Sequence, residues 1–336
     1  MIRDGKQVVT HTDHRFLLTN AALGDMITSL PAIIFAMQNV HPQVKLSVYV
    51  PVWQIELVRH LLAPYGTIDV RDLNEVPAKA DSPERAEWRG DASVSMNGAV
   101  QNTHTRNRVH MVDYAFNFLI NARPEDMKQR SYPTAALLGS RVLPYPYVVF
   151  PVGATSDNKL FHASVMAPIM RWCQENSYAV VIPGTKTSHT NTQVDGQLKP
   201  ITLRDQVDLL PKELFDACVD MREKTTLMEL RDLLGHAAAV VGVDGGTLHL
   251  AGTTDVPIVF ASGTTLPKHR YIPRHGDSTY RARYVGPRNL ECTGCQSNWS
   301  LTTWHFTKCP YTERPNACME MLHPDDFING LKELGL

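Results

Sequence analysis

Residues Val240–Ala251, VVGVDGGTLHLA, carry the strongest structural signal in the chain. A continuous apolar run ending at Asp244 predicts a strand buried on both faces, as in a parallel sheet. Two glycines follow, and Thr247–Gly252 can begin a helix. Ligands of open α/β sheets bind beyond the carboxyl ends of the strands, and glycines let a phosphate reach the free N–H groups at a helix start. The stretch therefore predicts an α/β fold with a phosphate-binding turn. A tight turn capped by Asp244 is the simpler alternative.

Strand and helix patterns alternate over the rest of the chain, which predicts parallel sheets. Residues 142–151, VLPYPYVVFP, place three prolines around an apolar strand and look like a linker. We expect one α/β domain over residues 1–143, a second over 144–323, and a C-terminal helix over 324–336. The expected strands are Phe16–Thr19, Lys45–Val50, Ile68–Val70, Tyr147–Phe150, Ala179–Ile182, Ala238–Val243 and Val256–Ala261. The expected helices are Met26–Asn39, Trp53–Leu62, Val109–Asn121, Ser164–Asn176, Thr226–His236 and one that begins at Pro324.

Charge and composition exclude several classes of protein. The 336 residues include 33 Lys+Arg and 34 Asp+Glu, a net charge of −1, which is not that of a protein that coats DNA by bulk charge. A 43% hydrophobic content excludes a disordered chain. The longest apolar runs fall far short of the ~20 residues of a membrane span. The N-terminus lacks an apolar signal core, so we expect no export and a cytoplasmic location.

The neutrality is an average over unequal stretches. From Pro267 to Arg288, six basic residues stand against one acid, a local charge of +5. This segment is either a solvated surface loop or a wall for an anionic ligand. A second, weakly positive region lies between Arg106 and Arg130.

Two more segments have the character of ligand-binding turns. Pro151–Lys159, PVGATSDNK, follows a predicted strand and offers the Thr155 hydroxyl and the Lys159 cation, a reasonable diphosphate clamp. Its alternative is a solvated loop with a surface lysine. Asn20–Pro31, NAALGDMITSLP, follows the first strand, and Asp25 heads its helix. Asp25 is either a general base that projects into an interdomain cleft, or an N-cap or helix-dipole partner.

Together these segments resemble glycosyltransferase family 9, which includes the lipopolysaccharide heptosyltransferases. The resemblance rests on Leu23-Gly24-Asp25 with Pro31, on Pro151-Val152-Gly153 with Lys159, and above all on Thr226–Ala251, which is similar to the family's leucine-rich helix, strand and D-x-G-x-x-H-x-A block. It implies a GT-B fold, in which two Rossmann-like domains face each other across a cleft. The N-terminal domain would bind the acceptor and the C-terminal domain the nucleotide sugar.

The resemblance also implies the chemistry, an inverting, metal-independent glycosyltransferase that moves a sugar from a nucleotide-diphosphate sugar to an acceptor hydroxyl. Direct displacement needs one base, and without a metal the charge on the leaving diphosphate must be met by N–H groups, a helix dipole and cations. By position, Asp25 would be the base. Thr155 and Lys159 would hold the diphosphate, Thr225 would lie near the nucleotide, Asp244 near the sugar hydroxyls, and Gly245, Gly246 and His249 near the phosphates. Gly245 departs from the family, which usually has Ser or Thr there.

Four cysteines lie near the C-terminus, in the pattern Cys292-x2-Cys295-x13-Cys309-x8-Cys318. This spacing predicts a structural zinc site, with unligated thiols, disulfides or another metal as the alternatives. A related Cys-rich tail is common in the family that the chain resembles. No cofactor is expected to be required for catalysis.

The acceptor stays open. The family favours a glycan or a lipopolysaccharide core, and a modified base in DNA, of the kind that some bacterial viruses make, would have to be flipped into the cleft. A non-catalytic nucleotide-sugar-binding protein and a two-domain epimerase are alternatives of other classes. We expect a nucleotide-diphosphate sugar and an anionic acceptor, glycolipid or DNA, as the partners of a monomer.

Overall fold

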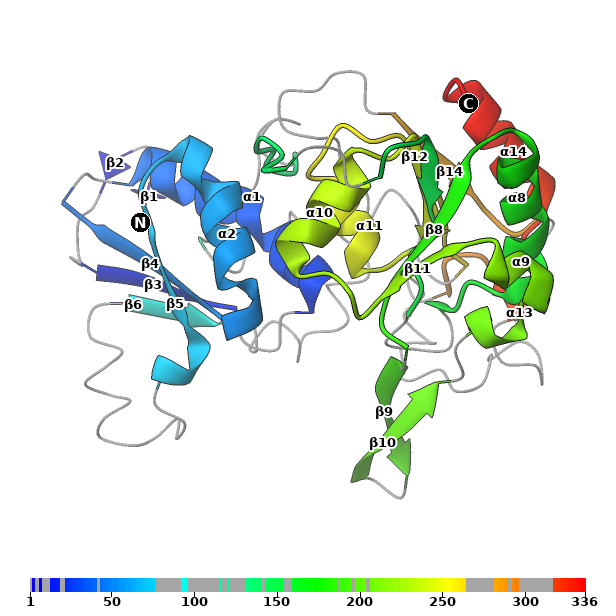
Figure 1. Cartoon of the computed structure of the whole chain (residues 1–336). Coiled ribbons are helices and arrows are strands. Elements are labelled where there is room, and N and C mark those ends of the chain that lie inside the picture. Colours follow the sequence, from blue (N-terminus) through cyan, green and yellow to red (C-terminus); the bar gives the residue numbers. More distant parts are fainter. Residues whose placement is uncertain are drawn as a thin grey trace. The chain divides into compact units, whose positions relative to one another are not determined.

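The computed structural model describes residues 2–3, 6–7, 13–18, 22–40, 43–76, 92–95, 115, 120, 131–139, 143–153, 159–186, 188–194, 197–203, 206–263, 281–288, 290, 292–295 and 317–336. The chain divides into two compact units, the first mainly over Met1–Ala136 and the second over Leu137–Tyr271 and Thr279–Leu336. Each unit contains a parallel sheet with helices, so the predicted α/β class is confirmed (Figure 1). The domain boundary at residue 143 stays a prediction. No helix within the described ranges is long and apolar enough to cross a membrane.

The sheet of the first unit has four parallel strands in the order β5-β4-β3-β6. The chain starts in the interior at β3, adds β4 and β5 on one side, and then returns to place β6 on the other side. The strand order therefore reverses at β3, and the carboxyl ends of strands at such a reversal are where open α/β sheets bind ligands. The strands are β3 (Asp13–Leu17), β4 (Lys45–Val50), β5 (Asp69–Asp72) and β6 (Ala92–Ser95), and a separate two-stranded pair is formed by β1 (Ile2–Arg3) and β2 (Lys6–Gln7).

The helices of the first unit follow from its apolar spacing. Helix α1 (Leu23–Asn39) begins three residues before the predicted start and is buried over a continuous run from Met26 to Ile34. The segment predicted as one helix over Trp53–Leu62 is a 3-10 turn, η1 (Val52–Gln54), followed by α2 (Ile55–Leu62). Helix α2 buries one face only, as an amphipathic surface helix does. Of the helix predicted over Val109–Asn121, the structure describes only Ala115 and Ile120, both helical.

The second unit has six parallel strands in the order β11-β8-β7-β12-β13-β14. Numbered along this sheet's own sequence, the order is 3-2-1-4-5-6, that of a doubly wound Rossmann sheet. The reversal lies between β7 and β12, which are neighbours in space although about 90 residues apart along the chain. The strands are β7 (Tyr147–Val149), β8 (Ala179–Gly184), β11 (Val219–Arg222), β12 (Ala239–Val243), β13 (Ile258–Ala261) and β14 (Ala282–Val285).

The core of the second unit joins its sheet to helices from both ends of the unit. Phe161 packs between Phe150, which follows β7, and Phe327 of the C-terminal helix, with ring centroids 6.5 Å and 5.3 Å apart. All three rings are buried, so the C-terminal helix is part of the domain core. The helices of this unit are α8 (Ala163–Glu175), α9 (Lys212–Asp216), α10 (Leu227–Gly235), α11 (Gly246–Ala251), α13 (Ala317–Glu320) and α14 (Pro324–Glu333).

The sequence patterns did not predict the antiparallel pair of β9 (Ser188–Val194) and β10 (Gln197–Leu203). Figure 1 shows it as a ribbon beside the main sheet of this unit, and it forms a sheet of its own. The dipeptide Asp195-Gly196 between the two strands is a strong hairpin signal and would have identified it.

The basic stretch is not a continuous loop, because its described residues 281–288 contain strand β14. Arg288 pairs with Asp326 at the start of α14 and holds the pKa of that carboxyl below its usual value. Arg283 Nε donates to Glu333 at 2.8 Å, and Arg281 donates to the carbonyl of Leu334. These three arginines therefore contact the C-terminal helix, and an anion-binding role of the stretch stays a prediction. The stretch's other three cations, Lys268, Arg270 and Arg274, lie outside the described residues.

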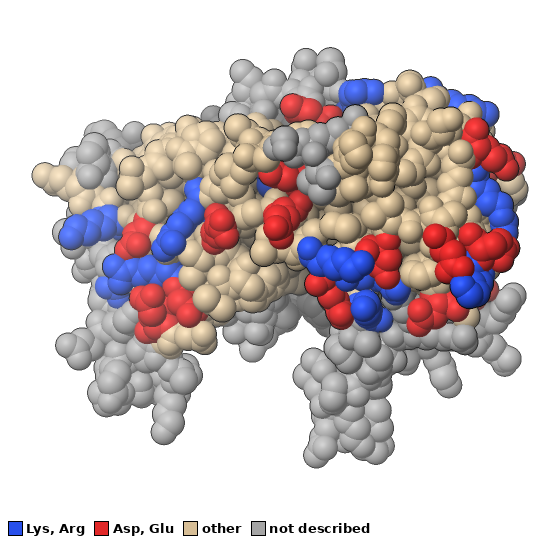
Figure 2. All heavy atoms as spheres, viewed as in Figure 1, with Lys and Arg blue, Asp and Glu red and all other residues tan. Residues whose placement is uncertain are grey.

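Surface charge agrees with the near-neutral composition. On the face shown in Figure 2, acidic and basic side chains are interspersed among the described residues of both units.

Gly184, the last residue of β8, is required by a close backbone approach. It lies at φ +129°, and a Cβ there would overlap the carbonyl oxygen of Val152. The amide of Val152 in turn donates to the carbonyl of Pro183 at 3.1 Å. Strands β7 and β8 therefore meet backbone to backbone at their carboxyl ends.

We expect Gly184→Ala to lower the free energy of unfolding by about 2–3 kcal/mol, because the methyl group needs both a strained φ and a displaced strand. Urea unfolding followed by circular dichroism measures this. Gly245→Ser is the control, since Gly245 has an extended backbone and a Cβ there would lie 3.6 Å from the nearest atom, the Val243 carbonyl oxygen. Equal stability of the two variants would contradict the contact.

Candidate functional site

The candidate site is built around Asp244, the residue that follows β12. Its backbone N–H donates to the carbonyl of Ala261 at 2.9 Å, which extends the pairing of β12 with β13 and fixes the position of the side chain. Carboxylate oxygen Oδ2 lies 3.2 Å from Lys159 Nζ, and Oδ1 lies 3.5 Å from His249 Nε2. Three of the predicted donor-binding residues therefore form one cluster at the reversal between β7 and β12.

Because Asp244 and His249 are buried, their positions are fixed by the contacts within this cluster. The side chain of Asp244 is 5% exposed and that of His249 7% exposed, and a buried carboxylate is costly unless it is paired. Lys159 is 29% exposed, so its ammonium group is paired with Asp244 and still accessible to solvent. An ammonium has three N–H donors, which leaves Lys159 able to bind an anion as well.

Helix α11 begins directly beside the cluster. Gly245 is its N-cap, and its carbonyl accepts the amides of Leu248 and His249 at 3.1 Å and 3.3 Å. The first N–H groups of a helix have no partner within the helix, so those of Gly246 and Thr247 face the carboxyl edge of the sheet as donors. The family's Ser or Thr at position 245 would fit here, because φ is −162° and a Cβ would meet only an ordinary contact. The backbone conformation does not require glycine at this position.

Thr225 lies at the same edge of the sheet, between β11 and α10. The next residue, Thr226, caps α10 in a reciprocal capping box, in which its hydroxyl accepts the amide of Glu229 and the Glu229 carboxylate accepts the amide of Thr226. The predicted helix over Thr226–His236 is confirmed. Thr225 therefore lies next to a fixed helix start, within the loops that follow the strands.

Asp25 occupies the first turn of α1, which follows the reversal strand of the first unit. The N-cap of α1 is Ala22, so the interpretation of Asp25 as an N-cap is wrong. The backbone carbonyl of Asp25 accepts the hydroxyls of Thr28 and Ser29 at 3.0 Å and 2.8 Å. Its side chain is half-buried, and its roles as general base or helix-dipole partner stay predictions. Thr155, the remaining predicted donor-binding residue, lies outside the described residues.

Nearly half of the chain matches the profile of a known protein family. The sequence profile described as glycosyltransferase family 9 (heptosyltransferase) matches residues 121–270, which contain Lys159 and the whole α10–β12–α11 block. The resemblance to family 9 is confirmed. Over 151 residues the chain is 30% identical to lipooligosaccharide heptosyltransferase 2 of Haemophilus influenzae, a match that covers 45% of this chain and 39% of that protein.

A second relative and one solved structure are also similar to the chain. It is 26% identical to the autotransporter heptosyltransferase Aah of Escherichia coli over 203 residues, 58% of this chain and 45% of Aah. The matches thus span less than half the length of either relative. The structure of TibC, an iron-containing dodecameric glycosyltransferase of enterotoxigenic E. coli, superposes with a TM-score of 0.69 at 18% identity over 98% of this chain and 77% of TibC. TibC has also been solved with ADP-D-beta-D-heptose. These neighbours confirm the GT-B fold class of the chain.

The segment that matches the family 9 profile contains a buried arginine that the sequence patterns did not identify. Arg231 of α10 is fully buried and donates through Nε and Nη2 to the hydroxyl and carbonyl of Thr253, at 3.1 Å and 3.0 Å. Burial lowers the pKa of this guanidinium. Because Thr253 follows α11, Arg231 joins α10 to the helix that begins at the candidate site. An arginine in an otherwise leucine-rich helix was the available signal.

Two segments of the Cys-rich C-terminal part contact Gly263. The amide of Gly294, within Cys292–Cys295, donates to the carbonyl of Gly263 at 2.8 Å, and a Cβ on Gly263 would overlap Cys318 Sγ. Cys309 lies outside the described residues. Within the part of the chain that the structure describes, no group of three or more His, Cys, Asp or Glu could hold a metal ion. The zinc site therefore stays a prediction.

We expect Asp244→Asn to lower the free energy of unfolding by about 1–3 kcal/mol, because it leaves Lys159 and His249 beside a neutral amide in a buried site. Asp216→Asn is the matched control, since Asp216 pairs with Lys212 on the surface and its loss should cost less than about 0.5 kcal/mol. Chemical unfolding of both variants gives the comparison. A control variant as destabilised as Asp244→Asn would show that the cluster at the reversal has no special weight.

Proposed function

We propose that the protein is a glycosyltransferase of the heptosyltransferase type. It moves a sugar from a nucleotide-diphosphate sugar to an acceptor hydroxyl, with inversion and without a catalytic metal. The observation that carries the proposal is the Asp244–Lys159–His249 cluster at the reversal of the second sheet. The match to family 9 and the heptosyltransferase relatives support the reaction class.

The donor diphosphate binds at this cluster. Lys159 supplies the mobile cation, with the Thr155 hydroxyl beside it in sequence. Gly245 and Gly246 supply N–H groups at the start of α11, and His249 lies near the phosphates. Asp244 holds Lys159 and His249 in place and faces the sugar hydroxyls. Together these groups meet the charge that develops on the leaving diphosphate, which is the main electrostatic task of the reaction. The TibC complex with ADP-D-beta-D-heptose supports ADP-heptose as the first donor to test.

Asp25 is the general base that deprotonates the acceptor hydroxyl. A single-displacement reaction inverts the anomeric centre and needs no protein nucleophile, so one carboxylate suffices. Asp25 lies after the reversal strand of its own sheet, the place at which an open α/β sheet presents catalytic groups.

The acceptor is a glycan hydroxyl of the lipopolysaccharide-core type. One named relative is a lipooligosaccharide heptosyltransferase and the other an autotransporter heptosyltransferase, so a protein hydroxyl is the second candidate. A DNA base has less support as the acceptor than a glycan or a protein hydroxyl, because three arginines of the basic stretch contact α14 and its C-cap.

We further propose that the four C-terminal cysteines hold one structural metal ion. The support is the spacing of the four cysteines in the sequence and the description of TibC as iron-containing. Thiolates bind both zinc and iron, so metal analysis of the purified protein decides between them. A protein purified without metal and still fully folded would contradict this site.

We expect Asp25→Ala to lower the rate of transfer about 10²–10⁴-fold while the Kd of the nucleotide donor changes less than twofold, because the base acts only on the acceptor. Radiolabelled sugar transfer and calorimetric donor binding measure the two effects. Asp69→Ala is the control, since Asp69 starts β5 at the opposite, amino end of its strand. Undiminished transfer by Asp25→Ala would contradict the assignment.

The donor itself is tested by a thermal-shift panel of nucleoside diphosphates and their sugars. A cognate donor at about 100 times its Kd should add about 2.7 kcal/mol of stability. Turnover of the donor sugar without any acceptor would instead indicate an epimerase. Donor binding without turnover on glycan or protein acceptors would favour a non-catalytic binding protein.

A further inference from the structure

Three residues lie in one row across the carboxyl edge of the second sheet. Val152, just after β7, bridges to Gly184 at the end of β8, and the amide of Glu223, just after β11, donates to the carbonyl of Gly184 at 2.8 Å. Neighbouring strands lie about 4.8 Å apart, so the backbone of Glu223 is roughly 10 Å from that of Val152. The row therefore runs from the start of the Lys159 loop outward over the end of β8 to Glu223.

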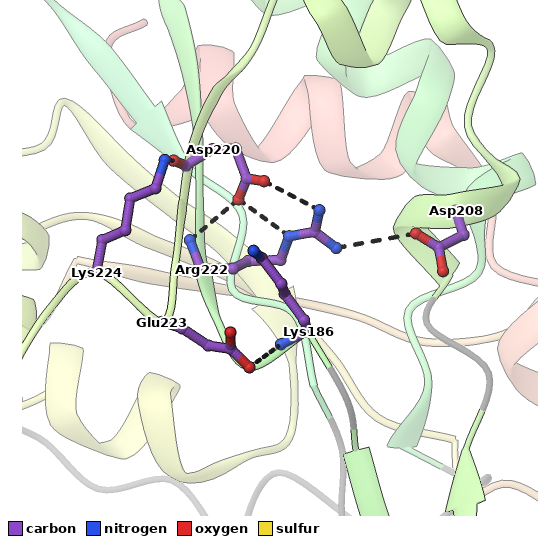
Figure 3. A network of polar contacts seen from close by, with 6 residues as sticks. All are labelled: Lys186, Asp208, Asp220, Arg222, Glu223 and Lys224. Carbon is purple, nitrogen blue, oxygen red and sulfur yellow. Dashed lines mark hydrogen bonds and ion pairs between the residues drawn. The ribbon is translucent and has the colours of Figure 1, made fainter.

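The carboxylate of Glu223 points back to the end of β8. Its Oε1 accepts the backbone amide of Lys186 at 3.4 Å, as Figure 3 shows, and the side chain is exposed. Glu223 has φ +59°, a region that non-glycine residues seldom adopt. Glycine would fit this position without strain, and the glutamate side chain is present at a conformational cost.

The two residues beside Glu223 are held to Asp220, as Figure 3 shows. Arg222 donates through Nε and Nη2 to the two carboxylate oxygens of Asp220, both at 3.0 Å, and lowers the pKa of that carboxyl. The buried Arg222 guanidinium also lies over the ring of Phe215, 5.2 Å from its centroid. Lys224 Nζ donates to the Asp220 carbonyl at 2.6 Å.

In this network, Glu223 is the carboxylate that is held by a backbone amide rather than paired with Arg222. Asp220 forms an ion pair with Arg222. Asp208 is the second acidic partner of Arg222, at 4.0 Å. The Glu223 carboxylate accepts the backbone amide of Lys186, whereas a carboxylate has about four acceptor positions. Glu223 is thus held at the end of β8 with most of its acceptor capacity unused by that contact.

We propose that Glu223 binds the ribose hydroxyls of the nucleotide donor, an assignment that rests on the proposed donor site at Lys159 and Asp244. In doubly wound sheets that bind nucleotides, an acidic residue at the end of the second strand accepts the ribose hydroxyl. The second strand here, β8, ends in Gly184-Thr185-Lys186 and has no acid. Glu223 supplies the carboxylate at that place from β11. With the diphosphate between β7 and β12, the nucleoside extends outward over β8 to reach it.

The test compares ADP, GDP and UDP with their 2′-deoxy forms by calorimetry. Wild-type protein should bind the cognate ribonucleotide at least about 10-fold more tightly than its 2′-deoxy form. Glu223→Gln should weaken ribonucleotide binding about 10-fold and leave the 2′-deoxy affinity within twofold. Glu213→Gln is the matched control, since Glu213 is exposed on α9, before the amino end of β11.

Glu223→Gly separates ligand binding from folding. Glycine relieves the positive φ, so this variant should unfold at a temperature no lower than the wild type and still lose the preference for ribose. Unchanged ribose preference in both variants would overturn the role of Glu223 while leaving the donor site intact. A wild-type protein that binds none of the nucleoside diphosphates would overturn the proposed function and, with it, this assignment.

Discussion

A buried carboxylate between a lysine and a histidine side chain organises the second unit. Asp244 lies at the end of β12, Lys159 comes from the loop after β7, and His249 comes from α11. These segments meet only because the strand order reverses between β7 and β12. A buried Asp244 is stable only with its partners in place. The contacts that form the candidate site therefore also stabilise the fold.

The same topological rule appears in the first unit on a smaller scale. Its chain also reverses around its first long strand, β3, and the segment that follows carries Asp25 in the first turn of α1. The two units thus offer different chemistry at equivalent places in their sheets. The second unit gathers Lys159, His249 and N–H groups, which we propose meet the leaving diphosphate. The first unit presents the half-buried Asp25, which we propose as the base.

Local signals were sufficient where local physics determines the structure. The apolar run before Asp244 is the interior strand β12, and Thr226 with Glu229 forms the capping box that starts α10. Asp244 and Lys159 could be predicted to lie near each other, but not to form an ion pair, because they are 85 positions apart in the sequence. The Asp195-Gly196 dipeptide between β9 and β10 is also a local signal, and it is typical of a hairpin turn.

The basic stretch shows where local patterns fail. Strand β14 contains Arg283 and Tyr284, which look like surface-loop residues in isolation. Arg283 of this strand pairs with Glu333, and Arg288, which follows the strand, pairs with Asp326. Both acids belong to α14, about 40 to 50 residues away in sequence. The conformation of Glu223 was equally hidden, since a positive φ at a non-glycine residue is imposed by its surroundings.

The central claim is that a nucleoside diphosphate binds at the reversal between β7 and β12. Hydrogen exchange with mass spectrometry, with and without ADP at saturation, tests it most directly. The account predicts slower exchange in the amides of residues 153–160 and 245–250, and no change at the amino ends of β7 and β12. Bound ADP with protection confined to other segments, or at those amino ends, would contradict it.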